Sequence, residues 1–239
     1  YVFIKDYDRA IATLRNLLDV NPDSVVAYYF LGKIYEENLQ NFPKAIAMYN
    51  EAISIDSGSI NVHEALGEIY LKMKQLKNAL AKYREIAHLE PDNVAVQIRI
   101  ALIYFELKDY EHAITIFEEI LHDNPDADKI RFYLGVLYEN TKQSQKAAEQ
   151  YGLVPANSSY FKDARLREAT LLRLTDKRDE AINVVRSAIR EKPLSEFYGF
   201  LAALYEENKD YKSAIDVLEE AHKVAPSDEK LLFLLGVFY

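Results

Sequence analysis

The 239-residue sequence contains no cysteine. Disulfide bonds, thiolate metal sites and a cysteine nucleophile are therefore excluded, and the chain suits either a reducing cytosol or a periplasm. No apolar run approaches the ~20 residues that a membrane-spanning helix needs, and no signal peptide opens the chain. The sequence starts within a repeat, so we interpret it as a piece of a longer protein.

Motifs that mark common enzyme classes are also missing. There is no G-x-S-x-G, no phosphate-binding glycine loop and no G-x-G-x-x-G. The five histidines form no H-E-x-x-H pattern, which favours packing or surface roles over zinc binding. Adjacent glutamates such as Glu36 and Glu37 point about 100° apart on a helix, so they indicate solvated faces and not acid–base pairs. We therefore expect no enzyme activity, no metal site and no cofactor.

Positively charged residues are fewer than negatively charged ones: the chain has 29 Lys and Arg and 38 Asp and Glu. The resulting net charge of −9 argues against a nucleic-acid partner, since phosphate binding depends on clustered cations. Residues 162–195 are the exception, with nine Lys or Arg against six Asp or Glu. This basic segment is either a solvated face or a docking patch for an acidic partner, formed by Arg165, Arg167 and Arg173.

Alanine, by contrast, recurs at a nearly constant interval. The steps between successive alanines of one column are 35, 34, 34, 34, 34 and 33 residues. The column consists of Ala10, Ala45, Ala79, Ala113, Ala147, Ala181 and Ala214. Such self-similarity predicts a supersecondary unit of about 34 residues that stacks on copies of itself.

Three further columns keep the same period. Small residues occupy Gly32, Gly67, Ala101, Gly135, Ala169, Ala202 and Gly236. Three residues after each lies an aromatic residue or, once, a leucine: Tyr35, Tyr70, Tyr104, Tyr138, Leu172, Tyr205 and Tyr239. Four residues after the alanines lie Leu14, Tyr49, Tyr83, Phe117, Tyr151, Val185 and Leu218. Apolar residues at i, i+3, i+4 and i+7 predict two amphipathic helices per unit, and the small columns predict that these helices cross closely.

These columns resemble the pattern of the tetratricopeptide repeat family. The match is carried by Tyr28, Leu31, Gly32, Tyr35, Ala45, Tyr49 and Ala52, and again by Tyr198, Leu201, Ala202, Tyr205, Ala214, Leu218, Ala221 and Pro226. The resemblance covers essentially the whole chain. It implies an all-α solenoid in which antiparallel helix pairs stack into a right-handed superhelix with a concave groove.

The same resemblance implies one continuous array over residues 1–239. A partial repeat at 1–24 precedes six full repeats, and a partial repeat at 229–239 follows them. The full repeats span about 25–59, 60–93, 94–127, 128–161, 162–194 and 195–228. A bacterial multi-repeat protein is indicated, and the compartment stays open between the cytoplasm and the periplasm or cell envelope.

The first full repeat and the fourth depart from this pattern. One extra residue is expected in the turn at Leu39-Gln40-Asn41, with Pro43 opening the next helix. Pro155 falls inside an expected second helix, so that helix should end near Val154. Either the array bends around residues 152–160 or it tolerates a shortened helix.

The fifth repeat departs in its first helix. Ser158 or Ser159 is expected to cap this helix. Glu168 replaces the apolar residue of its siblings, which are Leu31, Leu66, Ile100, Leu134 and Leu201.

The groove that the resemblance implies would be lined by first-helix side chains. The candidates are Tyr29, Lys33, Glu36, Glu68, Leu71, Ile98, Leu102, Phe105, Phe132, Val136 and Glu139. Family members that grip a C-terminal carboxylate use Lys and Asn at two of these positions, and no repeat here has that pair. The apolar candidates either receive an apolar or amphipathic segment with basic flanks or pack against one another.

We therefore interpret the chain as a non-catalytic scaffold or adaptor that binds a protein or peptide in its groove. The alternative is a structural array that self-associates or assembles a multiprotein complex. Apolar residues near the two ends, Val2, Phe3, Leu231, Leu234 and Leu235, are the expected contacts for self-association.

Overall fold

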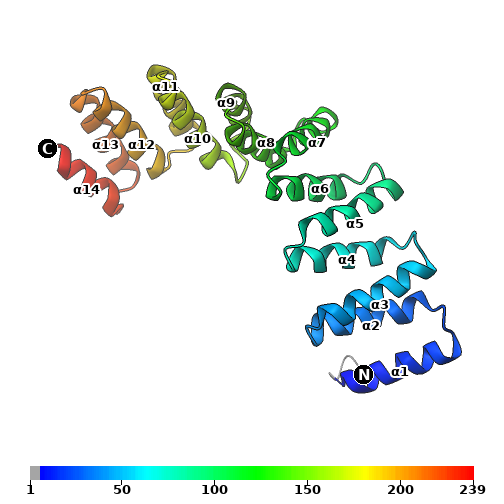
Figure 1. Cartoon of the computed structure of the whole chain (residues 1–239). Helices are drawn as coiled ribbons and strands as arrows, with labels where there is room; N and C mark the ends of the chain where they lie inside the picture. Colours follow the sequence, from blue (N-terminus) through cyan, green and yellow to red (C-terminus); the bar gives the residue numbers. More distant parts are fainter. Residues whose placement is uncertain (1–5) are drawn as a thin grey trace. The chain divides into compact units, whose positions relative to one another are not determined.

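The computed structural model describes residues 6–239, which form fourteen α-helices joined by short turns (Figure 1). Successive helices pack in pairs, so the predicted all-helical, repeat-based solenoid is confirmed. The chain divides into two compact units between Ile116 and Phe117, here called the N-terminal and C-terminal units. Val2 and Phe3 lie outside the described residues.

Each pair has a first and a second helix. The first helices are α2 (Val25–Lys33), α4 (Ile60–Lys72), α6 (Val94–Glu106), α8 (Asp128–Asn140), α10 (Phe161–Leu174), α12 (Ser195–Glu207) and α14 (Glu229–Phe238). The second helices are α1 (Tyr7–Val20), α3 (Phe42–Ile55), α5 (Leu76–Leu89), α7 (Tyr110–Asp123), α9 (Ser144–Gly152), α11 (Arg178–Glu191) and α13 (Tyr211–Val224). Several begin at a side-chain cap, as where the Asn41 amide oxygen accepts the N–H of Lys44.

The turns inside the pairs share one backbone geometry. One residue in each adopts a left-handed φ of 49° to 62°: Gln40, Lys74, Lys108, Lys142, Asp176 and Lys209. The next N–H then donates back to a carbonyl near the end of the first helix, as from Gln75 to Tyr70 at 2.8 Å. This closure satisfies carbonyls that the helix end would leave without partners, and it reverses the chain within three residues.

The extra residue of the first full repeat does not lie in the turn, which corrects the expectation from the sequence. The turn has the usual length, and the first helix instead ends in a π-helical segment, η2 (Ile34–Asn38). Its wider winding is closed by the N–H of Leu39, which donates to the carbonyl of Ile34 at 3.1 Å. Pro43 lies in the first turn of α3, as predicted.

Helix α9 is short, as Pro155 predicts. It ends at Gly152 after nine residues, whereas α11 and α13 each have fourteen. Ser158 is buried, and its hydroxyl accepts the N–H of Tyr160 at 3.0 Å. The expectation that Ser158 or Ser159 caps α10 is therefore wrong: the residue before the helix is Tyr160, with no side-chain capping bond, and Ser158 closes the turn that precedes it. The bend expected around residues 152–160 stays a prediction.

The close crossing within a pair is formed by glycine and tyrosine. A Cβ atom on Gly67 would lie 2.8 Å from the ring of Tyr83, and one on Gly135 would lie 2.6 Å from the ring of Tyr151. Gly32 has the same relation to Tyr49. Where the second-helix position is Phe117, Val185 or Leu218, the first helix carries alanine. Glycine therefore stands where a tyrosine ring must lie against the helix backbone.

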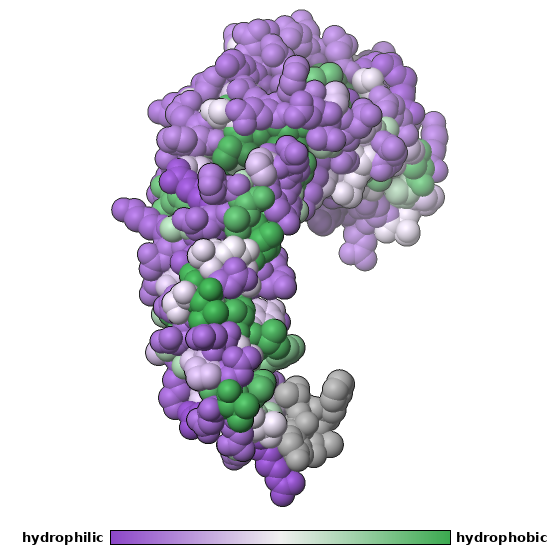
Figure 2. Space-filling view, turned by 90° about the vertical axis from the view of Figure 1, so that its right-hand side faces the viewer, coloured by the Kyte–Doolittle hydropathy of each residue, from purple (hydrophilic) through white to green (hydrophobic). Residues whose placement is uncertain are grey.

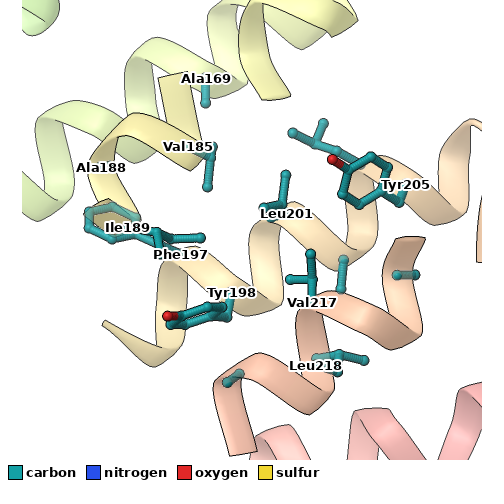
Figure 3. Close-up of a cluster of buried hydrophobic side chains, with 14 of the residues drawn as sticks. Ala169, Val185, Ala188, Ile189, Phe197, Tyr198, Leu201, Tyr205, Val217 and Leu218 are labelled. Atoms are coloured by element: carbon teal, nitrogen blue, oxygen red, sulfur yellow. The ribbon is translucent and has the colours of Figure 1, made fainter. Parts of the chain in front are cut away.

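The core of the C-terminal unit shows how these columns fill space (Figure 3). Phe197, Tyr198 and Leu201 of α12 pack between α11 and α13 and are at most 2 % exposed. On α14, Leu231 is buried and Leu234 and Leu235 are half-buried. This corrects the expectation that these leucines form an exposed end; the exposed apolar residues of that helix are Leu232, Phe233 and Val237.

Alanine substitution should have opposite effects on stability at a glycine that contacts a tyrosine ring and at a glycine with open space around it. Gly135→Ala is expected to destabilise the C-terminal unit by about 1–3 kcal/mol, because the ring of Tyr151 is fully buried and cannot retreat. Gly236→Ala, where nothing lies within 4 Å, should stabilise α14 by about 1 kcal/mol through helix propensity. Hydrogen exchange of the helix amides measures both changes, and the same sign at both sites would contradict the packing argument.

Candidate functional site

The predicted groove residues of the N-terminal unit lie on α2, η2, α4 and α6. Leu71, Ile98, Leu102 and Phe105 are half-buried, and none of them is fully enclosed. We call these four side chains the apolar strip. Tyr29 and Lys33 are also half-buried, and the Lys33 ammonium lies 6.0 Å from the centre of the Tyr29 ring. The candidates on α6 are all apolar, whereas those on α2 and η2 are aromatic or charged.

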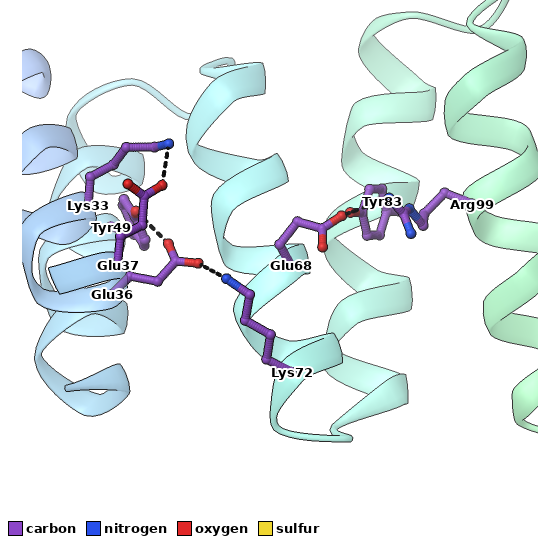
Figure 4. Close-up of polar contacts among 8 residues, drawn as sticks. All are labelled: Lys33, Glu36, Glu37, Tyr49, Glu68, Lys72, Tyr83 and Arg99. Carbon is purple, nitrogen blue, oxygen red and sulfur yellow. Dashed lines mark hydrogen bonds and ion pairs between the residues drawn. The ribbon is translucent and has the colours of Figure 1, made fainter. Parts of the chain in front are cut away.

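The glutamates beside this strip are held by neighbouring side chains (Figure 4). Glu36 is 6 % exposed; its carboxylate accepts the Tyr49 hydroxyl at 2.9 Å and the Lys72 ammonium at 2.7 Å. One repeat later, Glu68 accepts the Tyr83 hydroxyl at 2.6 Å and pairs with Arg99 at 3.0 Å. Each triad joins both helices of one pair to the first helix of the next.

The tyrosines of the triads are protonated donors. Burial raises the pKa of Tyr49 and of Tyr83 far above the usual range, and the adjacent carboxylates, Glu36 and Glu68, raise it further. A phenol that cannot ionise offers its proton to the glutamate at all physiological pH values. The acidic flanks predicted from the sequence are therefore parts of internal hydrogen-bond networks.

The C-terminal unit repeats this arrangement once. The Tyr151 hydroxyl donates to Glu139, and Arg167 pairs with the same carboxylate at 2.7 Å. Of the predicted groove residues here, Val136 is half-buried, whereas Phe132 is only 9 % exposed. The Phe132 ring packs against Tyr151 and Tyr160, with centroids 5.6 and 5.0 Å apart. Phe132 thus contributes to the core of this unit.

The three arginines of the predicted acidic-partner patch all lie on α10, but each pairs with a different glutamate. Arg165 bonds Glu168 at 2.7 Å, Arg167 bonds Glu139 at 2.7 Å, and Arg173 bonds Glu207 at 3.2 Å. Their side chains are 18 %, 47 % and 32 % exposed, respectively. An acidic partner at this patch would compete with these internal carboxylates.

The roles of the cations and phenols in the triads were not predicted from the sequence. Lys72, Arg99 and the hydroxyl groups of the tyrosine column did not stand out, because each triad draws on three helices. A signal was present nevertheless. Every repeat with the glycine–tyrosine pair also carries a glutamate one or four residues after the glycine, as at Gly67 and Glu68.

A second set of apolar side chains lies where a second helix meets the next first helix. Figure 2 shows apolar surface at successive levels of the N-terminal unit, in the part nearest the grey residues. The exposed apolar residues at these junctions are Val20, Val26, Ile55, Leu89 and Val94. They offer a comparison set for experiments on the strip, because they are apolar, exposed and in the same unit.

The described residues were also compared with the requirements of a metal site and of a membrane-spanning helix. Among residues 6–239, no three or more His, Asp or Glu side chains are grouped so that they could hold a metal ion. Within the same range, no helix combines the length and the apolar character that crossing a lipid bilayer demands.

Two adjacent glutamates provide a matched test of the triads. Glu36→Ala should lower the free energy of unfolding of the N-terminal unit by about 1–3 kcal/mol, because it leaves the buried Tyr49 hydroxyl without an acceptor. Glu37→Ala removes only an exposed pair with Lys33 and should cost about 0.3–0.5 kcal/mol. Hydrogen exchange of α3 and α4 amides measures the difference; equal effects would mean that the triad adds nothing.

Comparison with known families shows one consistent match. Models described as "Tetratricopeptide repeat" match residues 2–60 and 100–160, residues 70–128, and residues 196–238. No curated protein matches the chain.

Solved structures share the fold at low sequence identity. The C-terminal part of a TPR repeat-containing protein from Cytophaga hutchinsonii is 18 % identical, with a TM-score of 0.70 over 96 % of this chain and 95 % of that one. YrrB, described as a TPR protein with an unusual peptide-binding site, is 16 % identical, with a TM-score of 0.59 over 77 % of this chain and 94 % of that one. A tetratricopeptide repeat protein from Parabacteroides merdae is 17 % identical, with a TM-score of 0.58 over 100 % of this chain and 94 % of that one.

Proposed function

The chain belongs to the tetratricopeptide repeat family, and we propose that it is a non-catalytic scaffold that binds a peptide or protein segment along its first helices. Repeats of this family generally mediate protein–protein interactions and are typically not catalytic. The peptide-binding site named for YrrB supports the same kind of ligand for this chain.

The observation that carries the proposal is the half-buried apolar strip of Leu71, Ile98, Leu102 and Phe105. The charges beside it are balanced within the triads, so an incoming segment meets apolar surface bordered by neutral ion pairs. Burial of apolar area is then the main source of affinity. The ion pairs beside the strip favour segments that do not place a charge against the apolar side chains. Extended or helical segments with two or three large apolar residues fit this description. Basic flanks would have to displace Lys72 and Arg99 from Glu36 and Glu68.

Selection of peptides from a displayed random library tests this proposal. The wild-type chain should select apolar-rich peptides, and Leu102→Ser with Phe105→Ser should weaken them at least about tenfold, because anchoring side chains carry most interface energy. Phe132 is left unchanged, because its burial would confuse loss of binding with loss of folding. Isothermal titration of one selected peptide gives the affinities.

The matched control is Ile55→Ser with Leu89→Ser. These residues are 37 % and 44 % exposed at the C-terminal ends of α3 and α5, and neither belongs to the apolar strip. Peptide affinity should be unchanged in this variant. The proposal is wrong if both double variants weaken binding equally, or if peptides selected on the wild-type chain bind the strip variant as tightly.

Self-association is the second candidate, favoured by the exposed face of α14. Phe233 and Val237 are 71 % and 62 % exposed. If this face joins two chains, Phe233→Ser with Val237→Ser should reduce the mass measured by light scattering across a dilution series, because lost apolar contact weakens association. A mass that is monomeric at every concentration in the wild-type chain would exclude this candidate.

A further inference from the structure

A cavity of about 710 Å³ lies in the C-terminal unit between α9, α10 and α11. It is bordered mainly by second helices and therefore differs from the first-helix face to which the proposed function is assigned. Its size falls within the range of roughly 300–1,000 Å³ that is usual for small-ligand sites. Apolar side chains from α10 and α11 line it, among them Leu171, Leu172 and Val184.

The cavity exists because a recurring bridge is missing. At five other junctions, the residue five after the recurrent alanine bonds the phenol of the next first helix. The pairs are Arg15 with Tyr35, Arg84 with Tyr104, Glu118 with Tyr138, Arg186 with Tyr205 and Glu219 with Tyr239. At a sixth junction the phenol is retained as Tyr70.

Both members of the bridge are lost between α9 and α10. The equivalent positions are Gly152 and Leu172, and both residues line the cavity. The missing side chains therefore leave open the space that a phenol and a long polar side chain occupy at the other junctions. Two independent changes at one junction give this repeat a void that its neighbours fill.

A third change puts a carboxylate at the edge of this void. Glu168 stands where the sibling repeats have buried Leu or Ile, and its side chain is only 14 % exposed. Arg165 Nη1 donates to Glu168 Oε2 at 2.7 Å. Glu168 Oε1 has no hydrogen-bond partner among residues 6–239, and it lies 3.0 Å from where a Cβ of Gly152 would be. A side chain at Gly152 would cover this oxygen.

The charge of the lining favours a cation. Three carboxylates, of Glu149, Glu168 and Glu180, line the cavity with one ammonium, that of Lys177. Lys177 pairs with Glu180 at 3.4 Å and Arg165 pairs with Glu168 at 2.7 Å, so the lining carries one negative charge in excess, that of Glu149. Burial raises the pKa of Glu168, and the Arg165 guanidinium opposes this shift. A second cation at Oε1 would stabilise the ionised carboxylate further.

We propose that this cavity binds a protonated amine carried on an aromatic or aliphatic group. The ammonium lies at Glu168 Oε1, and the apolar group packs against Leu171, Leu172 and Val184. The ligand thus replaces the phenol and the polar head that the other junctions supply from the chain itself. Its source is either a free small amine or a lysine side chain of a bound protein.

Titration calorimetry with 2-phenylethylamine and its neutral analogue 2-phenylethanol tests the proposal on the purified chain. The amine should bind at least about tenfold more tightly than the alcohol, because only the amine forms a charge-assisted bond to Glu168. Glu168→Gln should remove this preference and leave the affinity for the alcohol unchanged. Glu149→Gln, a change to an exposed carboxylate of the lining, should keep the preference.

Restoring the repeat pattern provides the second variant. Gly152→Arg with Leu172→Tyr recreates the bridge of Arg84 and Tyr104, so it should fill the cavity and abolish binding of both compounds. If that double variant fails to fold, Glu168→Leu, which restores the sibling residue, must still remove the amine preference. Equal affinity for amine and alcohol, no binding of either compound, or undiminished binding to the filled variant would overturn the proposal.

The source of the amine is tested separately with an acetylated and amidated tripeptide that has a central lysine between two leucines. Tighter binding of the tripeptide than of 2-phenylethylamine assigns the site to a protein partner. Tighter binding of the free amine assigns it to a small molecule. Peptide binding that survives Glu168→Gln would place the peptide elsewhere and contradict this site as its location.

Discussion

The distance between the two helices of a pair controls most of the structure. In three repeats that distance is set by a tyrosine ring lying directly on a glycine backbone, as where Tyr83 meets Gly67. The ring is buried, so its hydroxyl needs an acceptor, and the same first helix supplies a glutamate. The charge of that glutamate, which is partly withdrawn from water, is paired with a cation from the next first helix. A steric condition thus leads to a polar network that ties successive repeats together.

This network determines which side chains of the first helices remain available to bind a partner. Glu36 and Glu68 stand out in the sequence as free acidic groups, but Lys72 and Arg99 already balance them. Recognition then depends on apolar side chains that are half-buried and not enclosed. The same reasoning locates the cavity in the C-terminal unit. At the junction of α9 and α10 the bridging side chains are replaced by Gly152 and Leu172, and the Glu168 carboxylate, whose side chain is 14 % exposed, loses its cover.

The repeat, the helix pairs and the early end of α9 could be predicted from the sequence, because period, amphipathicity and proline act locally. The π-helical segment at Ile34–Asn38 could not, because an extra residue fits equally well in a turn or in a helix until packing selects one. The burial of Phe132 was not predicted for a related reason: the resemblance implies that its position on the first helix faces the groove, whereas Tyr151 and Tyr160 pack against its ring. Side chains whose partners come from two other helices, such as Arg99, lie beyond what a linear pattern specifies.

A double-mutant cycle at the glycine–tyrosine crossing tests the central claim most directly. The cycle compares Gly67→Ala and Tyr83→Leu, alone and together, by the free energy of unfolding of the N-terminal unit. The account predicts a coupling energy of about 1–3 kcal/mol, since alanine should clash only when the ring is present. The chain itself combines alanine with leucine at Ala202 and Leu218. Strictly additive effects would show that the ring does not set the helix separation, and would contradict the account.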